Sequence, residues 1–253
     1  MNQHLPAHPE TSTLEQHKDT AWIPNPQFWV NTKDVPLSVG FEWSIAYKMI
    51  TAPTNARTII GAILPNAGVG NSIGMMIPDE NKEDFKFSAP YMMANINSLP
   101  FDFAIRQKVQ GQNINWYIVE QLPVISLSKF HATKFGPRTA GDIIRDAVIE
   151  LTYTSTDMSA FAHDMNFVGA DGKLKPPFVW DEDRRLRLRA KLDAVFFILY
   201  GITNRDDVRY IHSTFPIIER DETAKYGKYL SRDLCLAYIN ALQAGAPDAE
   251  VSL

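Results

Sequence analysis

The sequence predicts an α+β protein, in which a mixed small sheet with helices is followed by a mainly helical C-terminal part. Before residue 80, β-branched and apolar runs alternate with clusters of Pro, Gly and Asn, which is typical of strands and turns. After residue 136, apolar side chains recur at helical spacing. The composition, 45% hydrophobic and 21% charged over 253 residues, allows a sizeable core and excludes a disordered chain.

The first half divides into a polar lead-in and a mixed unit. Residues 1–20 are rich in Pro, Thr, Glu, Gln and His, so we expect a flexible lead-in, followed by a mixed α/β domain over residues 21–130. Alternation and β-branching predict three strands, the last two joined as neighbours through the turn cluster at residues 65–70. These strands are expected at residues 41–50, 57–64 and 71–77.

The remaining elements of this half surround a proline. A helix is predicted over residues 88–99, with Ser88 as N-cap, and Pro100 then kinks or restarts it. Residues 113–120 look like a strand.

The second half, residues 131–253, is predicted as a mainly helical region. An amphipathic stripe within residues 136–155 indicates one helix, and the strongest helix runs from a cap at Asp181 to a stop at Gly201. Two shorter helices follow, over residues 205–215, started by Thr203 or Asn204, and over residues 229–243.

Charge and cysteine content narrow the class of protein. Lys plus Arg is 25 and Asp plus Glu is 29, so the net charge of −4 gives no bulk basic character of the kind that marks many nucleic-acid binders. The single cysteine, Cys235, excludes a disulfide framework. No apolar run reaches the roughly 18 residues needed to cross a bilayer. We therefore expect no membrane contact and a soluble cytoplasmic protein.

None of the catalytic motifs suggested by the sequence has the neighbouring residues or elements that its chemistry requires. The glycines between Gly68 and Gly74 suggest a phosphate loop, but a proline follows too soon for the helix that such a loop needs, so a turn is favoured. Asn25-Pro-Gln-Phe28 lacks the second proline of an amine-holding Asn-Pro-Pro-aromatic motif. The histidines show no metal-ligand spacing, and we expect Cys235 to be a buried, inert thiol. We expect no catalytic residue, no metal site and no cofactor in this chain.

Two stretches carry local positive charge. The basic run from Arg184 to Lys191 is interpreted in two ways. It forms either a solvent-exposed face whose cations pair with Asp181, Glu182, Asp183 and Asp193, or a positively charged surface that contacts phosphates. The segment from residue 106 to 115 combines two cations with five amide side chains around a glycine. Amides pair with adenine edges and cations hold phosphates, although an ordinary polar loop has the same composition.

The order of segments resembles a known family. The runs N-S-x-x-F-D, R-Q-K and Q-L-P, together with LDAVFFILYG and FPIIER, are similar to the C-terminal target-recognition region of large adenine-specific DNA methyltransferases, the Eco57I-like and TaqI-like enzymes of restriction-modification and related phage-defence systems. The resemblance covers about residues 22–241 and implies a double-stranded DNA-recognition module. S-adenosylmethionine and methyl transfer would belong to a catalytic domain or subunit that is missing here, so the chain would be a fragment, a split-gene product or a remnant.

On this hypothesis the DNA contacts divide by chemistry. The cations Arg57, Arg106 and Lys108 would contact phosphate, and the amides Gln107, Gln112, Asn113 and Asn115 would read base edges, with Asn66 and Asn71 as secondary candidates. The alternative is a protein-protein interaction module that docks onto a partner subunit without DNA contact. An aromatic belt motivates that alternative, consisting of Trp22, Phe28, Trp29, Phe41 and Trp43.

Overall fold

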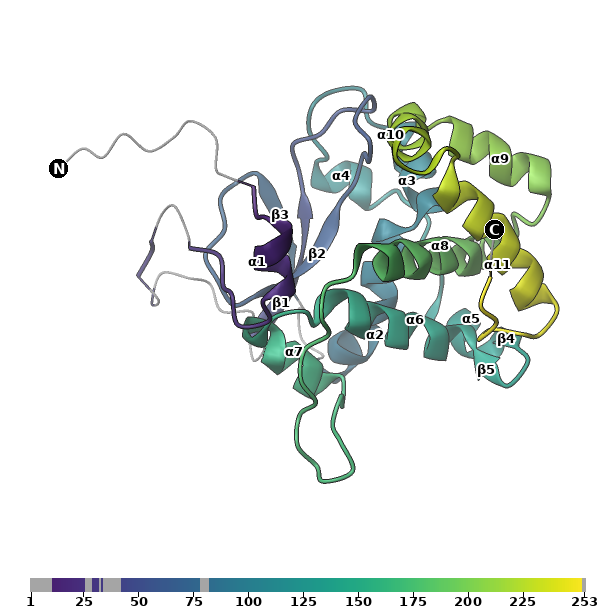
Figure 1. The fold of residues 1–253 in the computed structure, drawn as a ribbon. Coiled ribbons are helices and arrows are strands. Elements are labelled where there is room, and N and C mark those ends of the chain that lie inside the picture. Colours follow the sequence, from purple (N-terminus) through teal and green to yellow (C-terminus); the bar gives the residue numbers. More distant parts are fainter. Residues whose placement is uncertain (1–10, 26–28, 32, 34–41, 78–81, 252–253) are drawn as a thin grey trace.

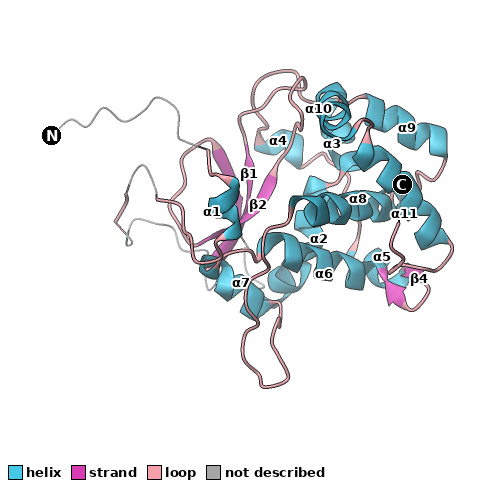
Figure 2. Cartoon of the chain, viewed as in Figure 1, coloured by secondary structure: helices cyan, strands magenta, loops and turns pink. Residues whose placement is uncertain are grey.

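A computed structural model describes residues 11–25, 29–31, 33, 42–77 and 82–251 of the chain. As the sequence predicts, the fold is α+β: a three-stranded antiparallel sheet lies on one side of a larger helical body (Figure 1; Figure 2). The sheet consists of β1 (Trp43–Lys48), β2 (Gly61–Pro65) and β3 (Ile73–Met76). A two-residue ladder, β4 (Lys134–Phe135) with β5 (Arg138–Thr139), lies apart from it.

The strand order corrects the expected hairpin. The order is β2-β1-β3, so the strands predicted as neighbours are the two edges and β1 lies between them. Ile45 pairs with Ile63 on one side and with Met76 on the other. All residues from Trp43 to Tyr47 are buried, so the side chains on both faces of β1 are covered. Such a strand belongs in the centre of the sheet, where its backbone is paired on both edges. Residues 66–72 run from the Trp43 end of the sheet to its Lys48 end instead of forming a tight turn, because β2 and β3 are both antiparallel to β1.

Two proline-containing helices follow the sheet. The first, α2 (Lys82–Asn97), starts before the predicted N-cap and keeps Pro90 inside. Ser88 is therefore not a cap, and its Oγ donates to the Phe85 carbonyl at 3.1 Å. The predicted restart is confirmed, because α3 (Leu99–Arg106) begins at Ser98 with a proline in its first turn.

The predicted strand at residues 113–120 is wrong. Its centre forms the short helix α4 (Trp116–Val119), and only Asn113 makes an isolated bridge, to Ile50. Ile118 is buried within α4, and Ile114, which is also buried, precedes the N-cap Asn115 and lies outside the helix. Helix α5 (Leu127–Ala132) follows.

The helices of the second half lie where their patterns predict. They are α6 (Ala140–Thr152), α8 (Glu182–Leu199), α9 (Arg205–Ser213) and α11 (Leu230–Gln243). Asp181 caps α8 by accepting from the Arg184 N–H at 2.9 Å, and Gly201 beyond it has φ +80°. Further elements were not predicted: α5, β4 and β5 given above, α1 (Leu14–Lys18) within the lead-in, the 3₁₀ turn η2 (Thr156–Met158), α7 (Ser159–Asp164) and α10 (Pro216–Tyr226). In α10 no residue is fully buried, so no apolar stripe marks it.

One hydrophobic core connects both halves of the chain. It extends from Trp43 in β1 to Leu242 in α11. Phe130, at the expected domain boundary, stacks on Tyr91 of α2 at 4.9 Å and meets Phe196 of α8 edge-on at 6.0 Å. Within the described residues, no helix is both long and apolar enough to span a bilayer.

Candidate nucleic-acid interface

The segment that follows β1, from Met49 to Thr51, and the segment before α4, from Gln112 to Ile114, lie side by side (Figure 1). The Ile114 N–H donates to the Met49 carbonyl at 2.8 Å, and the Thr51 N–H donates to the Gln112 carbonyl at 2.8 Å. Together with the bridge between Ile50 and Asn113, these bonds fasten the segment predicted for base reading to the central strand. We call residues 107–117 the amide loop.

The side chains of the amide loop face solvent. Gln107, Gln110, Gln112, Asn113 and Asn115 are exposed, and no described residue forms a hydrogen bond with their amide groups. Each amide therefore keeps two donors and one acceptor for an external ligand. Lys108 is exposed in the same loop and has no ion pair with any described residue.

Two exposed aromatic rings complete the amide loop, and sequence reasoning missed them. Trp116 is 46% exposed and Tyr117 is 60% exposed. The Trp116 ring meets the buried Tyr47 ring edge-on at 5.6 Å, which supports it from below. The sequence signal for this pair was the aromatic dipeptide directly after Asn115. It was overlooked because residues 113–120 were interpreted as a strand.

Arg57 turns inward. Its Nε donates to Asp102 Oδ2 at 2.5 Å and its Nη2 donates to the Asn97 carbonyl at 2.6 Å. Asp102 is fully buried and also accepts from the Thr58 N–H at 3.0 Å. Because removal of either partner would leave a buried group unpaired, this ion pair holds the start of β2 against α3.

Arg106 is also committed to the protein itself. Its guanidinium donates to Thr58 Oγ1 at 2.9 Å, to the Asn55 carbonyl at 2.8 Å and to the Thr214 carbonyl at 2.6 Å. It lies 4.0 Å above the Phe215 ring. Burial lowers the pKa of Arg106, and the charge of Asp102 opposes that shift. Arg106 thus connects the 51–58 loop to the helical half, beneath the amide loop.

The two secondary candidates lie at opposite ends of the sheet. Asn71 precedes Ser72, whose carbonyl accepts from the Met49 N–H at 2.9 Å, so Asn71 lies at the same end as Asn113. The Asn66 N–H donates to the Glu42 carbonyl at 3.0 Å, at the other end of β1. Both residues are exposed. The structure therefore brings Asn71 together with the amide loop and leaves Asn66 apart.

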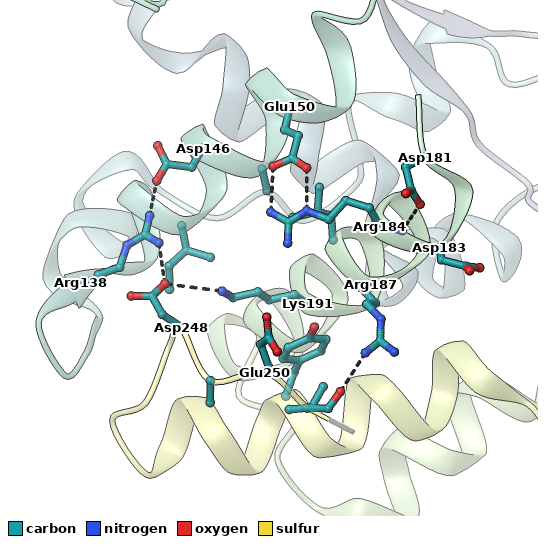
Figure 3. A pocket seen from close by; sticks show the side chains of 16 residues that line it. Arg138, Asp146, Glu150, Asp181, Asp183, Arg184, Arg187, Lys191, Asp248 and Glu250 are labelled. Atoms are coloured by element: carbon teal, nitrogen blue, oxygen red, sulfur yellow. Dashed lines mark hydrogen bonds and ion pairs between the residues drawn. The ribbon is translucent and has the colours of Figure 1, made fainter. Parts of the chain in front are cut away.

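Three cations of the basic run of α8, Arg184, Arg187 and Lys191, line a separate pocket of about 750 Å³, where they already have partners (Figure 3). Arg184 binds both oxygens of Glu150 at 2.7 and 2.9 Å, and Arg187 donates to the Val251 carbonyl at 2.8 Å. Arg138 contacts both Asp146 and Asp248, and Lys191 lies 3.9 Å from Asp248. The main partners of Arg184, Arg187 and Lys191 come from α6 and the C-terminal segment, not from within α8 as expected, and they leave little free charge for an external anion in this pocket.

The described residues show neither a metal cluster nor a continuous aromatic belt. No group of three His, Cys, Asp or Glu side chains among them could hold a metal ion. Cys235 is buried, and burial raises the pKa of its thiol well above the usual value. Trp43 is buried, whereas Trp29 is 80% exposed. Phe28 and Phe41 of the belt, and the motif around Asn25, lie wholly or partly outside the described residues.

Comparison of the chain with protein-family models, with curated proteins and with solved structures finds no match. The resemblance to DNA methyltransferases thus remains a prediction that rests on the sequence.

Proposed function

We propose that this chain recognises double-stranded DNA with its amide loop, as the target-recognition part of an adenine-specific DNA methyltransferase or restriction-modification enzyme. A methyltransferase catalytic domain or subunit, carried elsewhere, would bind S-adenosylmethionine and transfer the methyl group. The observation that carries the proposal is the set of exposed amide side chains beside Lys108 that bond to no described residue.

The chemistry of the loop suits a DNA groove. Asn and Gln side chains pair with the N6 and N7 edge of adenine through two hydrogen bonds, and an exposed lysine neutralises a phosphate. Trp116 and Tyr117 add apolar surface that can lie against thymine methyl groups or sugars. Arg57 and Arg106 act in this proposal as supports, because their donors already bind the protein.

Salt-dependent duplex binding tests the proposal. Duplexes enriched by the chain from a randomised pool, alone and with its catalytic partner, should bind more weakly by orders of magnitude as salt rises from about 50 to 200 mM. Lys108→Ala should weaken binding to every duplex and reduce the salt slope by about one unit. Asn113→Ala should cost about 1–3 kcal/mol on the enriched site alone.

Lys129→Ala provides the control, because Lys129 is an exposed lysine on α5, outside the amide loop. It should leave both the affinity and the salt slope unchanged. Absence of duplex binding at about 50 mM salt, with the catalytic partner present, would disprove the proposal.

A further inference from the structure

A second cavity, of about 380 Å³, has the size and lining of a small-molecule binding site. It lies between the edge strand β2 and helices α2, α6 and α8, and its size falls in the range of about 300–1,000 Å³ typical of ligand pockets. Arg57, Arg185 and Arg189 line it together with Asp193. The rest of the wall is mostly apolar and includes Ile63, Met93, Ala94, Val148, Leu151 and Leu192.

The positive charge in this cavity is only partly balanced. Asp102 is paired with Arg57, and Glu150 on neighbouring α6 is paired with Arg184. Arg185 donates to the Leu151 carbonyl at 2.9 Å, a neutral partner. Arg189 has no hydrogen bond or ion pair with any described residue. Asp193, which accepts from the Leu99 N–H at 2.7 Å, is the one acid on the cavity wall among the described residues.

The arginines of the cavity repel one another. Burial, and after it the charge of Arg189, lowers the pKa of Arg185 to about 10. Arg189 keeps an exposed surface, yet desolvation and then the charge of Arg57 lower its pKa too, against the opposing charges of Asp193 and of Glu222 in the adjoining cavity. A bound anion would relieve this repulsion, because it would favour the charged form of both guanidinium groups.

An adjoining cavity of about 290 Å³ supplies an unused donor. It shares Arg185 and Arg189 with the first cavity, and Trp180 lines it. The Arg185 guanidinium lies 3.6 Å above the Trp180 ring. Among the described residues, Trp180 Nε1 is the one buried side-chain polar atom without a hydrogen-bond partner. Buried donors are normally satisfied, so this N–H is a donor left for an acceptor bound in the adjoining cavity.

We infer that this cavity binds a small organic anion, with a phosphate or carboxylate group held by Arg185 and Arg189 and an apolar body packed against Met93, Leu151 and Leu192. The planar guanidinium fork matches both kinds of oxyanion through paired hydrogen bonds. The apolar wall is suited to an organic ligand more than to an inorganic ion. The inference does not depend on the proposed DNA function, because the amide loop contributes no residue to this cavity.

Binding of defined anions to the full chain tests the inference. We would titrate adenosine monophosphate, octanoate and inorganic phosphate by calorimetry and follow the thermal midpoint in parallel. At least one organic anion should bind more tightly than inorganic phosphate and raise the midpoint. Arg189→Gln should weaken that binding about tenfold or more, since a charge-assisted bond is lost.

Arg187→Gln is the matched control, because Arg187 lies two residues before Arg189 on the same helix but lines the separate pocket of about 750 Å³. It should leave the affinity for the anion unchanged. The inference fails if none of the three anions binds at millimolar concentration, if inorganic phosphate binds as tightly as the organic anions, or if Arg189→Gln leaves binding intact. Loss of duplex affinity in Arg189→Gln without loss of anion binding would instead assign these arginines to DNA.

Discussion

At the scale of single residues, buried His212 makes the stability of the protein depend on pH. It is 1% exposed on α9, its Nδ1 lies 2.8 Å from the Val208 carbonyl, and its ring stacks on Phe197. Burial lowers its pKa to about 4, against the pull of the Val208 carbonyl. The unfolded chain binds this proton below about pH 6.5, so the stabilisation present above that pH is lost as the pH falls toward 4, by about 3 kcal/mol.

We therefore predict that His212→Phe flattens the acid side of the stability curve, measured as the free energy of unfolding in urea between pH 7 and pH 4. A variant with the same acid loss as the parent would contradict the assignment to His212.

Asp193 provides a comparison of opposite sign. Desolvation raises its pKa from 3.8 to about 6, so the folded chain takes up this proton first and gains stability as the pH falls from about 6 toward 4. Asp193→Asn removes that gain. In the same urea series, the free energy of unfolding of Asp193→Asn should therefore fall more steeply between pH 7 and pH 4 than that of the parent. The free energy of unfolding of His212→Phe should fall less steeply.

At the scale of elements, the same capping box begins two helices of very different burial. Thr139 Oγ1 accepts from the Asp142 N–H at 3.1 Å, and Thr13 Oγ1 accepts from the Gln16 N–H at 3.2 Å. Helix α6 contains seven buried residues and α1 contains none. A cap contributes to global stability only where its helix is part of the cooperative core.

Thr139→Ala should therefore lower the free energy of unfolding by about 1 kcal/mol. Thr13→Ala should leave global stability unchanged and speed amide exchange in α1 alone, as read by hydrogen exchange. Equal losses in the two variants would show that α1 unfolds together with the core.

At the scale of the whole molecule, the aromatic chain from Tyr91 through Phe130 to Phe196 connects α2, α5 and α8 across the expected boundary at residue 130. Since one hydrophobic core includes both halves, we predict a single unfolding transition, with coincident midpoints by tryptophan fluorescence and far-UV circular dichroism. Phe130→Ala should lower stability by about 3–5 kcal/mol and keep the two midpoints together. Separate midpoints in the parent protein would indicate two independent units.

The sequence by itself predicted much of the local structure. Helices α6, α8, α9 and α11 were predicted because caps, apolar stripes and stop residues act within one or two turns. The three strands of the sheet were predicted from alternation and β-branching, whereas Asn113 was predicted to begin a strand that the structure does not contain. Among the elements it missed or misread, α10 lacks a local stripe, and α4 carries aromatic residues that also suit a strand.

The tertiary structure decided what connects these elements. The order β2-β1-β3 depends on which strand is buried on both faces, which no single segment encodes. Arg106 and Lys108 look alike in the sequence, yet Arg106 binds a carbonyl 108 residues away and Lys108 stays exposed. The arginine-lined cavity needs four elements to close. Local patterns determine each element because their interactions span a few residues, whereas the free cations and the cavity arise from contacts that exist only once the chain has folded.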